Sequence, residues 1–390
     1  MKQYHNTIHY KFLILILCTL PFINTSFIIG SKISITLFIL ILYMFIMIKN
    51  LKYIKIETDD TLLILFLFFM YMSQVINYKF SLEIRAITQL INLLIVIISY
   101  ISFKYLIKNT KLTIESILNL FFKYSSYIII ITLVFYVIGL VNNNLIFKIT
   151  HAINNSGSFS VGGIITSFEF GLPRLNTIMP EPSFISFFIA INIAIGLSLK
   201  DNNKILLFIN ILALILTIGR TGYLIFLIVV IYTIFTKNKY MKIYSFLISI
   251  LLFFCTIYIL NTNMLLNIDD SFRQRFESLF IVTNFIKDNF IFGIGLNGFY
   301  NYAENNNLDF HDIYSLYLYL FAGGGFIPFF IFISFLLYNY IYTDRKYRKI
   351  VIAIIIGWAT LSAYNMLYIW FLLALLRTKN EWSSKLLSVN

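Results

Sequence analysis

Long apolar runs recur along the whole chain, and short polar or charged connections separate them. Runs of about 15 to 30 apolar residues match a hydrocarbon core of about 30 Å. We predict membrane spans at 12–29, 33–48, 61–77, 87–106, 126–142, 183–199, 205–219, 221–236, 243–260 and 313–342, followed by a long apolar stretch at 350–376. The predicted fold is all-α and polytopic, with residues 1–390 forming a single integral membrane domain.

The apolar stretch at 350–376 has two interpretations. A single span there places Arg377, Lys379 and Lys385 on the side opposite the N-terminus. A break near 362–365 instead makes two short or re-entrant helices and returns the tail to the first side. The expected number of crossings is therefore about eleven or twelve.

Composition excludes a soluble domain of this length. Apolar residues make up 59% of the chain, charged residues only 12%, and the mean hydropathy is +0.85. Such a chain lacks the polar surface that water would require. Cys18 and Cys255 both lie inside apolar runs, which favours small core residues over a disulfide framework or a zinc site.

The net charge of +13 would suit a nucleic-acid or acidic partner, but its distribution indicates topology instead. With a cytoplasmic N-terminal anchor, the even-numbered connections are cytoplasmic, and they are rich in basic residues. These are Lys49, Lys52, Lys55, Lys104, Lys108, Lys111, Lys200, Lys204, Lys237, Lys239, Lys242, Arg345, Lys346, Arg348 and Lys349. We therefore expect a lipid bilayer as the partner, and no nucleic acid.

Two predicted extracytoplasmic loops, at about 143–182 and 261–312, are too long to be simple turns. The first is rich in Asn, Ser and Gly. The second contains an amphipathic stretch, 271–287, that suits a helix lying on the membrane surface. Loops of this length usually carry function.

Arginine is scarce, with 8 residues against 22 lysines, yet five arginines fall on the predicted extracytoplasmic side. These five are Arg85, Arg174, Arg220, Arg273 and Arg275. Arg220 stands between two strongly apolar segments, where a guanidinium requires a polar cavity, a carboxylate or an anionic ligand. Phosphate suits this planar donor because it accepts two parallel hydrogen bonds.

Two further polar residues precede predicted spans. Glu181 lies between two prolines, next to Ser183, which is suited to cap the following helix. It either sits near a helix N-terminus for structural reasons or acts as a base or partner of Arg174. His311 precedes the span beginning near Ile313 and is either an interfacial structural residue or a proton carrier.

These residues resemble the O-antigen polymerase and O-antigen ligase-like membrane family over roughly residues 120–345. Four elements match in order: Arg174 with Glu181-Pro182-Ser183; Gly219-Arg220-Thr221-Gly222; Asp270-Ser271 and Arg275 before Gly293-Ile294-Gly295; and His311 before a span with Gly323 to Gly325. Each element alone is weak, whereas the ordered set is fairly specific.

The resemblance implies a glycosyltransferase of GT-C-like architecture in the bacterial inner membrane, with its active site on the extracytoplasmic side. Its donor and acceptor would be undecaprenyl-diphosphate-linked oligosaccharides, with no metal or other cofactor, and a chain-length regulator is a possible partner. Arg174, Arg220 and Arg275 would bind the diphosphate, and His311 or Glu181 would act as the base.

Three functions remain in competition. The Glu-Pro-Ser element is more like the polymerases, and Asp312 stands where ligase-like members often have Asn after the histidine. A ligase, transferring polysaccharide to lipid A core, is the alternative within the family. A flippase or transporter would place ionisable residues near the middle of its spans, which here are nearly free of charge.

Overall fold

The computed structural model describes residues 2–20, 26–29, 31–48, 55–77, 84–110, 112–142, 168–169, 172–175, 182–201, 203–237, 278–279, 282–285, 287, 289–296, 298–305 and 313–378. In this part of the chain the protein is helical, apart from two short antiparallel hairpins.

The elements follow in chain order as α1 (Lys2–Thr19), β1 (Ser26–Ile29), β2 (Ser31–Ser34), α2 (Ile35–Ile48), α3 (Thr58–Ile76), α5 (Ile84–Asn109), α6 (Ile114–Val141), β3 (Phe168–Glu169), β4 (Leu172–Pro173), α8 (Pro182–Gly196), α9 (Lys204–Thr217), α10 (Arg220–Lys237), α14 (Gly298–Asn305), α15 (Leu316–Gly324), α16 (Phe326–Tyr342), α17 (Arg348–Thr360) and α18 (Leu367–Arg377).

Three of the described helices are long and apolar enough to cross a membrane, as judged by length and composition. They cover Thr58–Ile76, Ala86–Asn109 and Ile114–Val141, and several shorter apolar helices accompany them. The structure is therefore that of a helical protein suited to a membrane.

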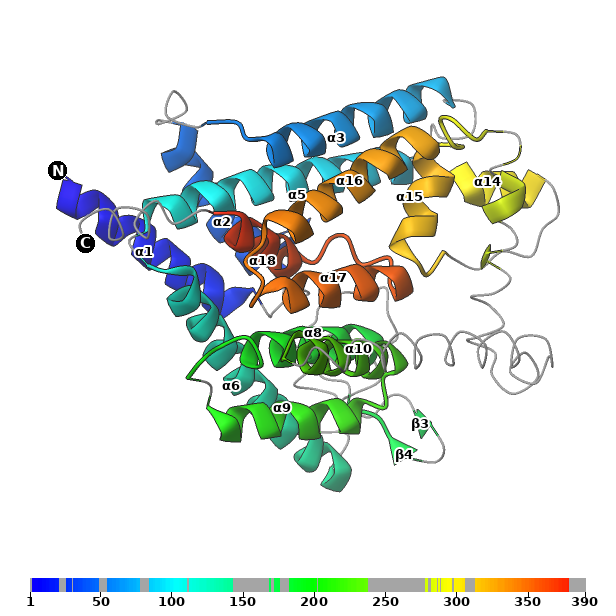
Figure 1. The fold of residues 1–390 in the computed structure, drawn as a ribbon. Helices are drawn as coiled ribbons and strands as arrows, with labels where there is room; N and C mark the ends of the chain where they lie inside the picture. Colours follow the sequence, from blue (N-terminus) through cyan, green and yellow to red (C-terminus); the bar gives the residue numbers. More distant parts are fainter. Residues whose placement is uncertain are drawn as a thin grey trace.

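The helices pack in layers, with α3, α5 and α16 above α17 and α18, and with α8, α9 and α10 below them (Figure 1). Helix α16 packs along α3, α18 along α5, and α8 against both α9 and α10, while α17 joins the layers through α8 and α10. Helix α18 is the centre of the core, because every residue from Tyr368 to Arg377 is buried.

Basic side chains mark one end of this bundle, which we call the basic end. Lys349 donates to the carbonyl of Leu197 after α8, and Lys346 pairs with Glu115 at the start of α6. Lys104, near the end of α5, belongs to the same end, because Asp59 joins it to Arg377, which lies over Tyr342 at the end of α16. The turn from α9 to α10 and the hairpin β3–β4 lie at the opposite end (Figure 1).

Two of the predicted spans in the first 142 residues have wrong boundaries. The span predicted at 12–29 is helical only to Thr19, and its last four residues form β1. Pro21 follows this helix closely and has no N–H to continue it. The span predicted at 126–142 begins earlier, at Ile114, because Thr113 caps α6 by accepting a hydrogen bond from the Ser116 N–H.

The single span predicted at 313–342 is also wrong, because it consists of α15 and α16, separated at Gly325. Gly325 has φ 78°, a conformation that a residue with a side chain rarely adopts. The predicted span at 243–260 lies outside the described residues.

Of the two interpretations of the stretch 350–376, the structure has the break near 362–365, since α17 ends at Thr360 and α18 begins at Leu367. Arg348, the first residue of α17, donates to the carbonyls of Ile341 and Thr343, just at the end of α16. Arg377 ends α18 with its guanidinium 4.6 Å from the ring centre of Tyr338 in α16. The two helices therefore form a hairpin that returns the chain to the basic end.

Candidate functional site

The turn from α9 to α10 has a strained backbone at Ile218. This residue adopts a left-handed conformation with φ 46° and ψ 37°. A β-branched residue is rarely found there, and the conformation costs about 1 to 3 kcal/mol unless its surroundings impose it. Thr217 supports the turn, since its hydroxyl donates to the Leu214 carbonyl and accepts from the Gly219 N–H.

Arg174 imposes much of this conformation from the segment after β4. Its Nε donates to the Thr217 carbonyl at 3.2 Å and its Nη2 to the Ile218 carbonyl at 3.1 Å. The next residue, Leu175, is buried and donates its N–H to the Leu216 carbonyl at 2.8 Å. A segment more than 40 residues away in sequence thus fixes the turn.

Two glycines let α8 approach the start of α10 very closely. A Cβ on Gly219 would lie 2.4 Å from both side-chain atoms of Ser186, and one on Gly222 would lie 2.7 Å from the Ser186 carbonyl oxygen. Ser186 is in the first turn and a half of α8, which begins at Pro182. The N-termini of α8 and α10 therefore lie side by side.

Arg220 is the first residue of α10, and its side chain is exposed. Helix N-termini carry a partial positive charge that attracts anions. An exposed guanidinium at the start of one helix, beside the start of a second, makes this corner suited to a phosphate-bearing ligand.

The second part of the site is a glycine-rich turn that packs against the break between α15 and α16. Gly293 and Gly295 have positive φ, and the N–H groups of Ile294 and Gly295 donate to the carbonyls of Ala322 and Gly323. A Cβ on Gly325 would lie 2.4 Å from the Gly293 nitrogen. The sequence motifs Gly293-Ile294-Gly295 and Gly323 to Gly325 are therefore in contact.

Polar side chains at the end of α3 hold this turn in place. Ser73 donates to the carbonyls of Phe292 and Gly323, and Asn77 donates to the Gly293 carbonyl. The Gln74 side chain accepts from the Leu296 N–H at 2.8 Å. Like the arginine turn, this segment is fixed by hydrogen bonds from a distant part of the chain.

The hairpin of α17 and α18 connects the two parts. Gly357 of α17 lies against Phe187 of α8, so closely that a Cβ there would be 2.0 Å from the ring. On the other side, Tyr317 in the first turn of α15 donates to the Ile355 carbonyl of α17. The end of α17 therefore lies between the start of α8 and the start of α15.

Of the predicted site residues, Arg174 and Arg220 are brought together at one turn. Glu181, Arg275 and His311 lie outside the described residues. Arg174 donates two hydrogen bonds to backbone carbonyls and so supports the turn that carries Arg220. Its predicted role at a diphosphate stays a prediction.

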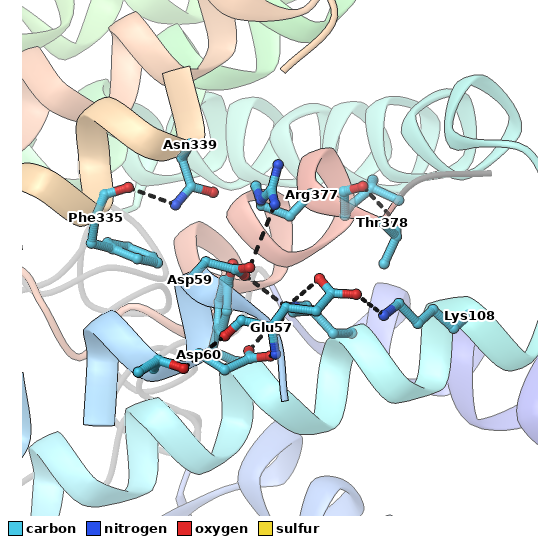
Figure 2. Close-up of polar contacts among 12 residues, drawn as sticks. Glu57, Asp59, Asp60, Lys108, Phe335, Asn339, Arg377 and Thr378 are labelled. Carbon is cyan, nitrogen blue, oxygen red and sulfur yellow. Dashed lines mark hydrogen bonds and ion pairs between the residues drawn. The ribbon is translucent and has the colours of Figure 1, made fainter. Parts of the chain in front are cut away.

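Sequence reasoning missed a buried charge cluster at the basic end (Figure 2). Lys104 is 3% exposed, and its Nζ lies 2.9 Å from Glu57, 2.7 Å from Asp59 and 2.9 Å from Asp60. Arg377 approaches the other oxygen of Asp59 at 3.5 Å. The lysines were interpreted only as topology signals, which is incomplete for Lys104.

The three carboxylates of this cluster have a spacing that suits a metal ion. The Lys104 ammonium, however, contacts all three and takes the place that a cation would occupy. The signal in the sequence was the acidic run Glu57 to Asp60 before one apolar span, with Lys104 and Lys108 one helical turn apart at the end of the next.

Comparison of the sequence with models of known protein families and with curated proteins gives no match.

Proposed function

We propose that this protein is a polysaccharide polymerase that joins undecaprenyl-diphosphate-linked oligosaccharide repeat units at the extracytoplasmic face of a bacterial inner membrane. It would be a multi-pass glycosyltransferase of GT-C-like architecture with about eleven or twelve crossings. The basic end would face the cytoplasm, in agreement with the positive-inside rule, and the arginine turn would face outwards.

The observation that carries the proposal is the arginine turn itself. Arg174 holds the strained α9–α10 turn through two carbonyls, and Arg220 is exposed directly after it, where the N-termini of α8 and α10 meet. Fixed donors at the point where negative charge develops are the main means of accelerating group transfer. A departing diphosphate is a group that needs such donors.

In the proposed reaction, an acceptor sugar hydroxyl attacks the anomeric carbon of the donor saccharide. A C–O bond forms to the acceptor oxygen, and the bond between the anomeric carbon and the diphosphate oxygen breaks, with its electron pair leaving on the diphosphate. The acceptor proton passes to His311 or Glu181, and Arg220 with Arg275 neutralises the leaving undecaprenyl diphosphate.

Reconstitution tests this proposal directly. We expect vesicles containing the protein and lipid-linked repeat units to form a ladder of longer glycans on a gel. Arg220→Ala should lower the rate about 100- to 1,000-fold, as the loss of one charge-stabilising donor does elsewhere. Lys204→Ala is the matched control, because Lys204 is an exposed basic residue at the start of the neighbouring helix α9 and faces the basic end.

The possible outcomes separate the rival functions. Transfer of preformed polymer to added lipid A core, without a ladder, would identify a ligase instead. Movement of lipid-linked saccharide across the vesicle membrane without any new glycosidic bond would identify a flippase. Equal rates for Arg220→Ala and Lys204→Ala would reject the arginine turn as the site.

A further inference from the structure

The tip of the α17–α18 hairpin, residues 361–366, is non-helical backbone between the two helices. Helix α17 has 13 residues and α18 has 11, so they rise about 20 Å and 17 Å from the basic end. Gly357 near the end of α17 lies against Phe187 in the second turn of α8, so the end of α17 reaches the level of the arginine turn.

Two indole rings hold this tip. Trp358 at the end of α17 donates its Nε1–H to the Ala363 carbonyl at 3.2 Å, and Trp370 of α18 donates to the Tyr364 carbonyl at 2.6 Å. Both tryptophans are buried and their rings pack together, with centres 5.4 Å apart. Non-helical backbone at membrane depth needs such internal partners.

The side chains of the tip divide into two groups. Leu361, Ala363, Tyr364 and Met366 are buried, whereas Asn365 is exposed and Ser362 is half-exposed. An exposed amide and a hydroxyl can both donate and accept hydrogen bonds, so these two side chains are available to a polar ligand.

Further polar and aromatic groups surround the tip. The ring of Tyr364 stacks on that of Tyr319 in α15, with centres 6.0 Å apart and an interplanar angle of 24°. The Tyr364 hydroxyl also interacts with the side chain of Asn92 in α5, which is half-buried. Amides, hydroxyls and tyrosine rings, with no charged residue from 361 to 366, suit a neutral ligand rich in hydroxyl groups.

The position of the tip suggests which ligand this is. On one side α17 contacts α8, whose start lies beside Arg220, and on the other it contacts the first turn of α15, which follows His311 in the chain. Under the proposed function, Arg220 binds the donor diphosphate and His311 is a candidate base for the acceptor hydroxyl.

We propose that Ser362 and Asn365 at the hairpin tip form a binding site for the neutral saccharide of the lipid-linked acceptor. This inference rests on the proposed function for the identity of the ligand. The tip would recognise sugar hydroxyls through neutral hydrogen bonds, while the arginine turn binds the charged diphosphate. The two parts of the substrate would therefore be held by separate, chemically different elements.

Intrinsic fluorescence provides a binding assay that does not depend on activity. Trp358 and Trp370 touch the tip, and the third tryptophan, Trp382, is removed by the background change Trp382→Phe. The probe is the phosphate-free saccharide released by mild acid from lipid-linked repeat units, which are extracted from cells lacking this protein.

We expect the probe to change the fluorescence of the full chain in a saturable way. Asn365→Ala and Ser362→Ala should each weaken binding about three- to tenfold, the effect of losing one neutral hydrogen bond. Asn119→Ala is the matched control, because Asn119 is a partly exposed asparagine of α6 at the basic end. No saturable binding to the parent protein, or equal affinity in all variants, would overturn the proposal.

Kinetics separate this inference from the proposed function. In reconstituted vesicles, Asn365→Ala should raise KM for the acceptor and leave kcat close to the parent value, whereas Arg220→Ala should lower kcat and leave saccharide affinity unchanged. Polymer formation with an unaltered acceptor KM in Asn365→Ala would reject the tip alone. Saccharide binding at the tip without any polymer would reject the polymerase and retain the site.

Discussion

The two ends of the bundle use positive charge in opposite ways. At the basic end, Lys104 is almost fully buried and contacts three carboxylates. At the opposite end, Arg220 is exposed, and Arg174 donates to backbone carbonyls of a strained turn. Breaking the buried ion pairs should destabilise the fold, whereas the exposed arginine beside a strained turn is the group that binds an anion under the proposed function.

The arrangement at the basic end follows from helix electrostatics. Asp59 and Asp60 are in the first turn of α3, where the partial positive charge of the helix favours carboxylates. Lys104 is near the end of α5, and Arg377 is the last residue of α18, where the partial negative charge favours cations. The cluster therefore joins three helices with charges that each helix already prefers.

Removing Lys104 should produce the largest effect on stability and thereby test this contrast. Lys104→Met leaves Asp59 and Asp60 buried without their main partner, and breaking a buried pair in this way costs about 3 to 5 kcal/mol. We expect a large fall in the melting temperature of the detergent-solubilised protein. Under the proposed function, any folded fraction should form polymer at the parent rate, because the cluster is at the other end of the bundle.

Lys108→Met is the matched control for this prediction. The Lys108 side chain is 38% exposed, and within the described residues its ion pair is with Glu57, so its loss should cost less than about 1 kcal/mol. If both variants melted at the same temperature, the cluster would not be the stabilising feature that its burial implies.

A methyl group at Gly219 should disturb the arginine turn at the end opposite the charge cluster. Its Cβ would meet Ser186 at 2.4 Å, and overpacking of this kind costs about 1 to 3 kcal/mol. Because the turn would shift Arg220, under the proposed function we expect Gly219→Ala to lower the rate of polymer formation at least tenfold, which corresponds to about 1.4 kcal/mol of transition-state stabilisation. Gel ladders and melting curves on the same preparation measure both effects.

The second-site change Ser186→Gly removes the two atoms closest to the new methyl group and leaves Thr217 Oγ1 at 3.1 Å. The double variant Gly219→Ala, Ser186→Gly should therefore recover most of the rate. Recovery of stability without recovery of rate would show that the turn does not position Arg220 for catalysis.

Sequence patterns predicted those features that depend on local signals. The helical class follows from the apolar runs, and the break near 362–365 was visible because polar residues interrupt an apolar stretch. The unusual placement of Arg174 and Arg220 was visible because arginine is scarce here. These signals require no knowledge of which segments meet in space.

Features that depend on distant contacts were not predictable in the same way. Gly325 breaks a span because it packs against Gly293, and neither residue alone indicates this. The contact of Arg174 with a turn more than 40 residues away could not be predicted from the sequence, because nothing local pairs the two segments. Lys104 agrees with the positive-inside rule, so its place in the sequence offered no reason to look for another role. Its three carboxylate partners became visible only in the structure.

The smallest expected effect concerns the exposed edge of the charge cluster, at Glu57. Burial raises the pKa of Glu57, but its hydrogen bonds and charge interactions with Lys108 and Lys104 outweigh this, so the net pKa is lowered. A lowered pKa in the folded state means that the carboxylate stabilises the fold above its unfolded pKa, about 4.3, and loses this contribution as the pH falls through the folded value.

Melting temperatures of the parent and of Lys108→Met should therefore differ modestly at neutral pH and converge in acid. Since Glu57 is about one-third exposed, salt should also reduce the difference. A difference that stays constant from neutral to acidic pH would show that the ion pair contributes nothing, and that the stability of the basic end comes entirely from its buried members.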